Sequence, residues 1–131
     1  MDDYRVIIAG SRTFDDYKML KEKCNSFLEK ERKNKNIIVV SGGARGADKA
    51  GEEYAKEEGF GLEVYPADWK KFGKSAGFRR NEEMAVVADA LIAFWDGLSH
   101  GTKHMIDIMK NKNSNVNVVY FNNATSNEQK G

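Results

Sequence analysis

The chain has 131 residues and a net charge of +1, with 40% hydrophobic and 31% charged residues. These values are typical of one soluble globular domain with a single core, and the near-zero charge argues against binding nucleic acid through bulk charge. No stretch approaches the roughly 20 apolar residues of a membrane span. The N-terminus also lacks the apolar core of a signal peptide, so we expect a cytoplasmic protein without a membrane partner. The histidines and the single cysteine lack the spacing of a zinc site, so we expect no metal.

Strands are predicted where apolar residues run together, and helices where they recur at helical spacing. The predicted elements are a strand at 4–9, a helix at 14–32, a strand at 37–40, a helix at 47–58, a strand at 62–65, a loop at 67–77, a helix at 78–87, a strand at 90–95, a helix at 102–111 and a strand at 116–121. Cys24 falls on the apolar face of the first helix and is expected to be a core thiol. Residues 1–121 are expected to form the domain, and the polar tail 122–131 to be disordered.

The alternation of strands and helices predicts an α/β fold. We expect a single Rossmann-like three-layer domain, with a parallel five-stranded sheet in the order 3-2-1-4-5. In such sheets the ligand lies at the C-terminal edge, where the order reverses between the first and fourth strands. The turns after the first, second and fourth strands all open onto this edge. Topology and residue chemistry therefore predict the same site.

The turn after the second strand reads Ser-Gly-Gly-Ala-Arg-Gly (41–46) and leads directly into a helix. A helix N-terminus presents unpaired N–H groups, and glycines allow close approach, so this junction favours an anion such as a phosphate. Ser41 offers a hydroxyl donor and Arg45 a planar charge, while Asp48 either complements the helix dipole or accepts a sugar hydroxyl. In the alternative interpretation, the glycines only close a tight turn and Arg45 is solvated. The spacing matches neither the dinucleotide fingerprint nor a P-loop.

Two other turns repeat this composition, at residues 10–13 and 96–102. In the loop at 67–77, Trp69 is placed to stack on a base or to cover the core. Arg79 and Arg80 begin a predicted helix, where cations are disfavoured, which suggests an anionic partner; solvation is the alternative. The candidate ligand-binding residues are Gly10, Ser11, Arg12, Ser41, Gly42, Gly43, Arg45, Gly46, Asp48, Trp69, Arg80, Asn81, Asp96, Gly97, Ser99, Gly101 and Thr102.

These residues also carry a family resemblance. Residues 40–48 resemble the Ser-Gly-x-Ala-Arg-Gly-x-Asp segment of the DprA/Smf proteins, which bind single-stranded DNA. Arg80 with Met84, together with 96–97 and 101–102, resembles the Arg-Lys-x-x-Met and Pro-Gly-Gly-x-Gly-Thr-x-x-Glu segments of the LOG phosphoribohydrolases. Both groups belong to the SLOG superfamily of Rossmann-like nucleotide-binding domains. With the segments 10–12, 66–69, 77–81 and 94–97, the chain is similar above all to the small YspA-like proteins, whose activity is unassigned.

The resemblance implies a nucleotide or nucleotide-derived ligand, of the ADP-ribose, NAD-derived or cyclic nucleotide type, bound by a sensor, carrier or sequestering protein. It implies no required cofactor, and a homodimer or higher homo-oligomer. Met105 stands where the LOG enzymes carry a glutamate, so no residue is assigned a catalytic role. Two alternatives stay open. One is a nucleotide N-glycosidase, and the other is a single-strand nucleic-acid module that uses the basic aromatic segment 69–74 with Arg79 and Arg80.

Overall fold

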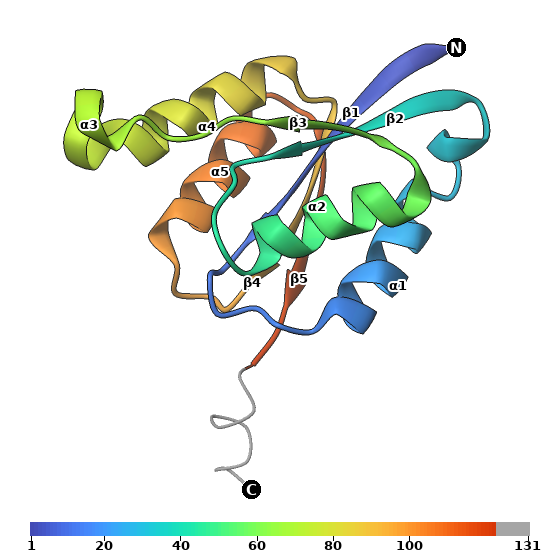
Figure 1. The fold of residues 1–131 in the computed structure, drawn as a ribbon, viewed down its shortest axis with the longest axis horizontal. Coiled ribbons are helices and arrows are strands. Elements are labelled where there is room, and N and C mark those ends of the chain that lie inside the picture. Colours follow the sequence, from blue (N-terminus) through green and yellow to red (C-terminus); the bar gives the residue numbers. More distant parts are fainter. Residues whose placement is uncertain (123–131) are drawn as a thin grey trace, which may run out of the picture.

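The computed structural model describes residues 1–122, in which five parallel strands form one sheet in the order β3-β2-β1-β4-β5 (Figure 1). The strands are β1 (Asp2–Gly10), β2 (Lys35–Ser41), β3 (Gly61–Val64), β4 (Ala90–Trp95) and β5 (Asn115–Tyr120). Strand β1 pairs in parallel with both β2 and β4, so the order reverses between β1 and β4. The predicted α/β Rossmann-like class and strand order are confirmed. The predicted disordered tail lies outside the described residues, apart from its first residue.

Helices cover both faces of the sheet (Figure 1). The helices α1 (Tyr17–Leu28) and α2 (Ala47–Glu58) pack on one face, and α4 (Ala76–Val87) and α5 (His100–Asn111) pack on the other. Side chains alternate along β1, so Val6 and Ile8 enter the first core while Ile7 enters the second. Cys24 is fully buried in the first core, as expected. Within residues 1–122, no helix combines the length and hydrophobicity that a membrane span needs.

The first helix is shorter than predicted, because polar residues define both of its ends. The Asp16 carboxylate accepts the backbone N–H of Met19 at 3.1 Å, so the helix begins after Asp16, and Phe14 lies buried in the core instead. Beyond α1, residues Glu31–Lys33 form a short 3-10 helix, whereas the sequence predicts that the first helix continues to residue 32. Arg32 is not fully solvated there, because its Nη2 donates to Glu58 Oε1 at 2.6 Å.

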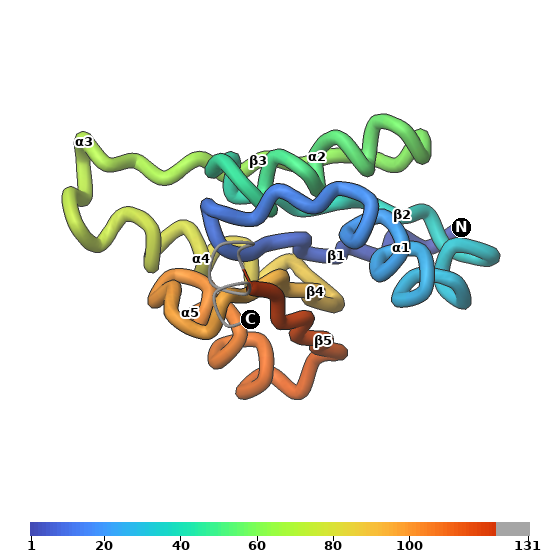
Figure 2. Tube along the Cα trace, turned by 90° about the horizontal axis from the view of Figure 1, so that it is seen from below, coloured from blue at the N-terminus to red at the C-terminus, as the bar shows by residue number. Residues whose placement is uncertain are grey.

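The predicted loop at 67–77 is partly helical. It contains α3 (Trp69–Phe72) and a 3-10 turn at Gly73–Ser75, after which α4 begins at Ala76. The Asp68 carboxylate caps α3 by accepting the Lys71 N–H at 3.1 Å, a local contact that hydrophobic periodicity does not reveal. Because α4 begins at Ala76, earlier than predicted, Arg79 and Arg80 lie at the end of its first turn, where the helix dipole gives less support for an anionic partner. In both Figure 1 and Figure 2, α3 projects at the end of the molecule opposite the N-terminus.

Candidate ligand-binding site

Two adjoining clefts lie at the C-terminal edge of the sheet. The central cleft, of about 450 Å³, is bordered by the turns after β1 and β4 and by the first turns of α4 and α5. The outer cleft, of about 440 Å³, lies beside the turn after β2. Both volumes fall within the range of small-molecule sites. Both clefts share the lining residues Arg12, Ala44, Trp69 and Arg80, so they form one continuous candidate site.

The turn after β2 is held by a buried hydroxyl. Ser41 Oγ donates to Glu52 Oε2 at 2.7 Å and accepts the Gly43 N–H at 3.1 Å. Ser41 is fully buried and lines neither cleft, so its hydroxyl serves the turn. Glu52 lies one turn after Asp48 on α2, and the sequence reasoning missed it because no glycine or arginine marks it.

Asp48 and Arg80 carry opposite charges that attract each other across this turn. Arg80 Nη1 donates to the Gly42 carbonyl oxygen at 2.5 Å, and the Asp48 carboxylate accepts the Ala44 N–H at 3.1 Å. Burial raises the pKa of Asp48 to about 6, although the Ala44 N–H and the charge of Arg80 oppose the rise. Burial likewise lowers the pKa of Arg80, against the attraction of Asp48. Both side chains line the central cleft, where Asp48 is poised to gain or lose a proton near neutral pH.

The turn after β4 positions the N-terminus of α5. The Asp96 carboxylate accepts the N–H groups of Leu98 at 2.8 Å and Ser99 at 2.9 Å. Burial alone would raise the pKa of Asp96, but these donors outweigh it and lower the pKa. On the other side, Asn81 Nδ2 donates to the Gly101 carbonyl oxygen at 3.1 Å and so ties α4 to the start of α5.

Ser11, in the turn after β1, connects the other two turns. Its N–H donates to the Phe94 carbonyl oxygen at 2.9 Å, and its hydroxyl accepts the Asp96 N–H at 3.1 Å. Its carbonyl oxygen accepts the Ala47 N–H at the start of α2. The following residue, Arg12, is exposed and lines both clefts. Ser11 therefore joins the three turns, and the neighbouring Arg12 places a positive charge in both clefts.

The structure brings most of the candidate residues to the two clefts. Those lining the central cleft are Gly10, Ser11, Arg12, Asp48, Trp69, Arg80, Asn81, Asp96, Ser99, Gly101 and Thr102. Those lining the outer cleft are Arg12, Gly42, Gly43, Arg45, Trp69 and Arg80. Ser41, Gly46 and Gly97 line neither cleft. Lys49 and Phe78 also line the clefts but are not among the candidate residues. In the sequence, only their position near the candidate residues Asp48 and Arg80 could have indicated them.

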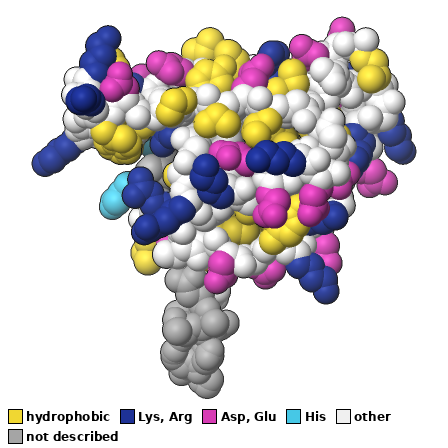
Figure 3. Space-filling model, in the orientation of Figure 1, with side chains coloured by type: hydrophobic (Ala, Val, Ile, Leu, Met, Phe, Trp, Pro, Cys, Tyr) yellow, Lys and Arg dark blue, Asp and Glu magenta, His cyan; other side chains and the backbone are white. Residues whose placement is uncertain are grey.

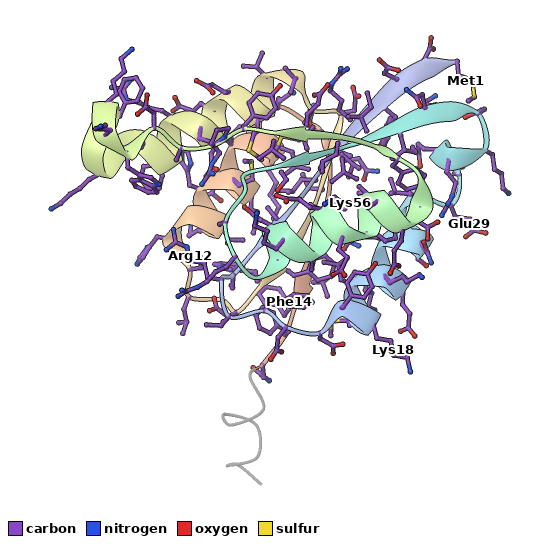
Figure 4. The ribbon with its side chains drawn as sticks, viewed as in Figure 1. Met1, Arg12, Phe14, Lys18, Glu29 and Lys56 are labelled. Atoms are coloured by element: carbon purple, nitrogen blue, oxygen red, sulfur yellow. The ribbon has the colours of Figure 1, made fainter. Side chains whose placement is uncertain are left out.

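The surface around the clefts is basic. Figure 3 shows Lys and Arg side chains gathered below the projecting segment of α3 and α4, whereas acidic and basic side chains are mixed over α1 and α2. Arg12 lies beside the start of α5, far from Lys18 on α1 (Figure 4). Among residues 1–122, no three His, Cys, Asp or Glu side chains are arranged to hold a metal ion. Guanidinium groups and backbone donors, together with the exposed indole of Trp69, are suited to an anionic ligand with a ring.

The fold and the clefts define a Rossmann-like domain with a candidate ligand site at the switch point of its sheet. Residues 4–72 match the model of the family YAcAr, described as the YspA, cpYpsA-related SLOG family. The chain therefore belongs to this family of the SLOG superfamily, as its motifs predict.

Two known proteins extend the comparison. The gene 61 protein of Mycobacterium phage D29 is 41% identical over 106 residues, which cover 76% of this chain and 83% of that protein. The X-ray structure of DNA processing protein A (DprA) from Streptococcus pneumoniae is similar with a TM-score of 0.68 and 18% identity. That match covers 89% of this chain and 50% of the DprA chain, so the present chain spans half the length of that structure. At this identity the likeness shows the fold alone.

Proposed function

We propose that this protein binds a nucleotide or nucleotide-derived ligand in the two adjoining clefts, as a sensor, carrier or sequestering protein. The observation that carries the proposal is that two arginines, Arg12 and Arg80, both line the wall shared by the two clefts. Burial is the main cause of the lowered pKa of Arg80, and the positive charge of Arg12 acts in the same direction, so the two guanidinium groups repel each other. A bound phosphate would relieve this repulsion and accept hydrogen bonds from both groups.

The remaining lining supports the nucleoside part of such a ligand. Trp69 is 52% exposed and Phe78 is 47% exposed, and both line the central cleft, where a base can stack on them. The side chain of Ser99 adds a hydroxyl that can pair with a sugar hydroxyl, whereas the amide of Asn81 is held by Arg80, Gly101 and His104. Membership of the SLOG family agrees with a nucleotide-related function.

A thermal-shift screen tests the proposal with AMP, ADP, NAD, ADP-ribose, cyclic ADP-ribose isomers and a short single-stranded oligonucleotide. A ligand at 100 times its Kd adds about 2.7 kcal/mol of stability, or several degrees in Tm for a domain of this size. Arg12→Gln should abolish the shift without altering the fold, because Arg12 is exposed and its side chain has no hydrogen bond or ion pair within residues 1–122. The matched control is Lys18→Gln on α1, which removes the same charge far from the clefts (Figure 4).

The screen separates the proposal from its rivals. If no nucleotide shifts the Tm, the clefts are not a nucleotide site. If only the oligonucleotide binds, and binding weakens steeply with salt, the single-strand nucleic-acid module replaces the proposal.

A second candidate function is hydrolysis of an N-glycosidic bond, favoured by the position of Asp48. Its carboxyl group lines the central cleft, and its pKa of about 6 suits a general acid that protonates a departing base while water attacks the sugar carbon. Met105 lines the same cleft and brings no carboxylate. Each binding mixture should therefore be analysed for free base. Release that Asp48→Asn abolishes while the thermal shift remains would establish turnover, and no release at high protein concentration would exclude it.

A further inference from the structure

The two clefts differ in charge. The charged residues that line the outer cleft are all cations, namely Arg12, Arg45, Lys49 and Arg80. The charged residues that line the central cleft are of both signs, namely Arg12, Lys74, Arg80, Asp48 and Asp96. The outer cleft therefore holds four positive charges without a carboxylate among its lining residues, whereas two carboxylates offset the cations of the central cleft.

The cations of the outer cleft are available to a ligand. Within residues 1–122, neither Arg12 nor Arg45 is paired through its side chain, and both are exposed. The ammonium group of Lys49 lies 3.5 Å from Glu52 Oε1, but the Lys49 side chain is 62% exposed, so this contact is weak. Arg80 is held in place by the Gly42 carbonyl oxygen at the floor of the turn. The carboxylate of Asp48 attracts Arg80, whereas the other three cations have no strong partner within residues 1–122, and such a cluster favours a multiply charged anion.

The uncharged lining of the central cleft has a different character. The apolar side chains of Trp69, Phe78 and Met105 meet the polar side chains of Asn81 and Ser99 there. This mixture suits a base and a sugar, and the two carboxylates disfavour a second phosphate. Since Trp69 also lines the outer cleft, a ring stacked on it would leave its phosphates within reach of the cations.

We infer that the outer cleft is a subsite for a phosphate chain, so that the preferred ligand is a nucleotide with two or more linked phosphates rather than a monophosphate. This inference rests on the proposed function and adds to it the class of ligand. Each further phosphate in the outer cleft gains charge-assisted hydrogen bonds, and one such bond is enough to raise affinity about tenfold.

The test measures Kd values by titration calorimetry for AMP, ADP, ATP, the matching guanosine nucleotides and inorganic tripolyphosphate. ADP should bind about tenfold tighter than AMP. In the double variant Arg45→Gln/Lys49→Gln this ratio should fall to about one, because the variant removes only cations of the outer cleft. The matched control Lys18→Gln/Lys23→Gln removes the same net charge from the exposed side of α1, and it should keep the ratio of the original protein.

Each result decides something different. Equal affinity for monophosphates and diphosphates, or a ratio that survives in the outer-cleft variant, overturns the subsite and leaves the proposed function intact. Tripolyphosphate binding as tightly as ATP assigns the cleft to free polyphosphate and overturns the nucleotide assignment. If no nucleotide binds, the proposed function fails, and the subsite fails with it.

Discussion

The turns after β2 and β4 both contain glycine, and each leads into a helix at the same edge of the sheet. Serine and aspartate occur at both junctions, with Ser41 at the end of β2 and Asp48 at the start of α2. The glycines of the two turns differ in how closely neighbouring atoms surround them. A Cβ atom on Gly42 would lie 2.6 Å from Arg80 Nη1, and one on Gly46 would lie 2.5 Å from the Ser11 carbonyl oxygen. A Cβ atom on Gly97 or Gly101 would meet nothing within 4 Å. The β2 turn therefore uses glycine to pack against its neighbours, whereas the β4 turn leaves open space at the start of α5.

The aspartates at the two turns, Asp48 and Asp96, also differ in their surroundings and in the direction of their pKa shifts. Asp48 is buried with one backbone donor, from Ala44, and burial raises its pKa to about 6. Asp96 accepts two backbone N–H groups, which overcome the effect of its burial and lower its pKa. The protein therefore destabilises the ionised form of Asp48 and stabilises the ionised form of Asp96. The β2 turn is therefore a crowded support, whereas the β4 turn is open and accessible.

The variant Gly46→Ala should produce the largest effect, because it breaks the packing of the β2 turn. Its φ of 80° is unfavourable for alanine, and the added Cβ would press on the backbone of Ser11 and Arg12. Strain and overpacking together should cost about 3 kcal/mol or more of unfolding free energy, measured by urea denaturation. Gly97→Ala is the matched control, since its φ of 84° imposes similar strain without a clash. It should cost only about 1–2 kcal/mol. Equal losses would refute the distinction between the turns.

The next prediction compares Asp48→Asn with Asp96→Asn across pH. The pKa of Asp48 is about 6 in the folded protein and about 3.9 in an unfolded chain, so the folded state binds the extra proton between these values. Its contribution to stability is present below about pH 4 and is lost as the pH rises through about 6. Relative to the original protein, Asp48→Asn should therefore gain about 2–3 kcal/mol between pH 4 and pH 7.

Asp96 should behave in the opposite sense. Its lowered pKa means that its ionised form stabilises the fold above the ordinary pKa and that this contribution is lost only as the pH falls further. The stability deficit of Asp96→Asn should thus be constant between pH 4 and pH 7 and shrink at lower pH. Urea denaturation at a series of pH values measures both variants. Parallel pH profiles for the two variants would contradict the assigned environments.

The fold was predictable because its signals are local. Runs of branched apolar residues mark the buried strands, and glycine turns separate them from helices, which determines the alternation and hence the parallel sheet. The short helix α3 was not predictable in this way, because it depends on the Asp68 cap and on four residues without a period. The early end of α1 at Leu28 has a similar cause, since the charged residues after it continue the helix by propensity but have no core to join.

The sequence predicted which turns form the site, but not which of their polar side chains face a ligand. Sequence shows that Ser41 and Ser11 both follow predicted strands, but it does not show that both hydroxyls are hydrogen-bonded within the protein. Ser41 is bound to Glu52, eleven positions away, and Arg80 reaches the Gly42 carbonyl oxygen across 38 positions. Such long-range contacts decide whether a polar group faces a ligand or supports a turn.

Gly101→Ala should have the smallest effect on stability and so sharpens the contrast between the turns. Gly101 lies in the first turn of α5 with open space where a Cβ atom would project, and alanine favours a helix over glycine by about 1 kcal/mol. The variant should therefore unfold at an equal or slightly higher urea concentration. If the open space admits the ligand, the added methyl group should nevertheless weaken nucleotide binding, by about tenfold for a contact worth 1.4 kcal/mol. Asn111→Ala, at the exposed far end of the same helix, is the control and should leave Kd unchanged. Unchanged affinity in Gly101→Ala would mean that the ligand approaches from the β2 side alone, and a loss of stability would mean that the β4 turn is as crowded as its counterpart.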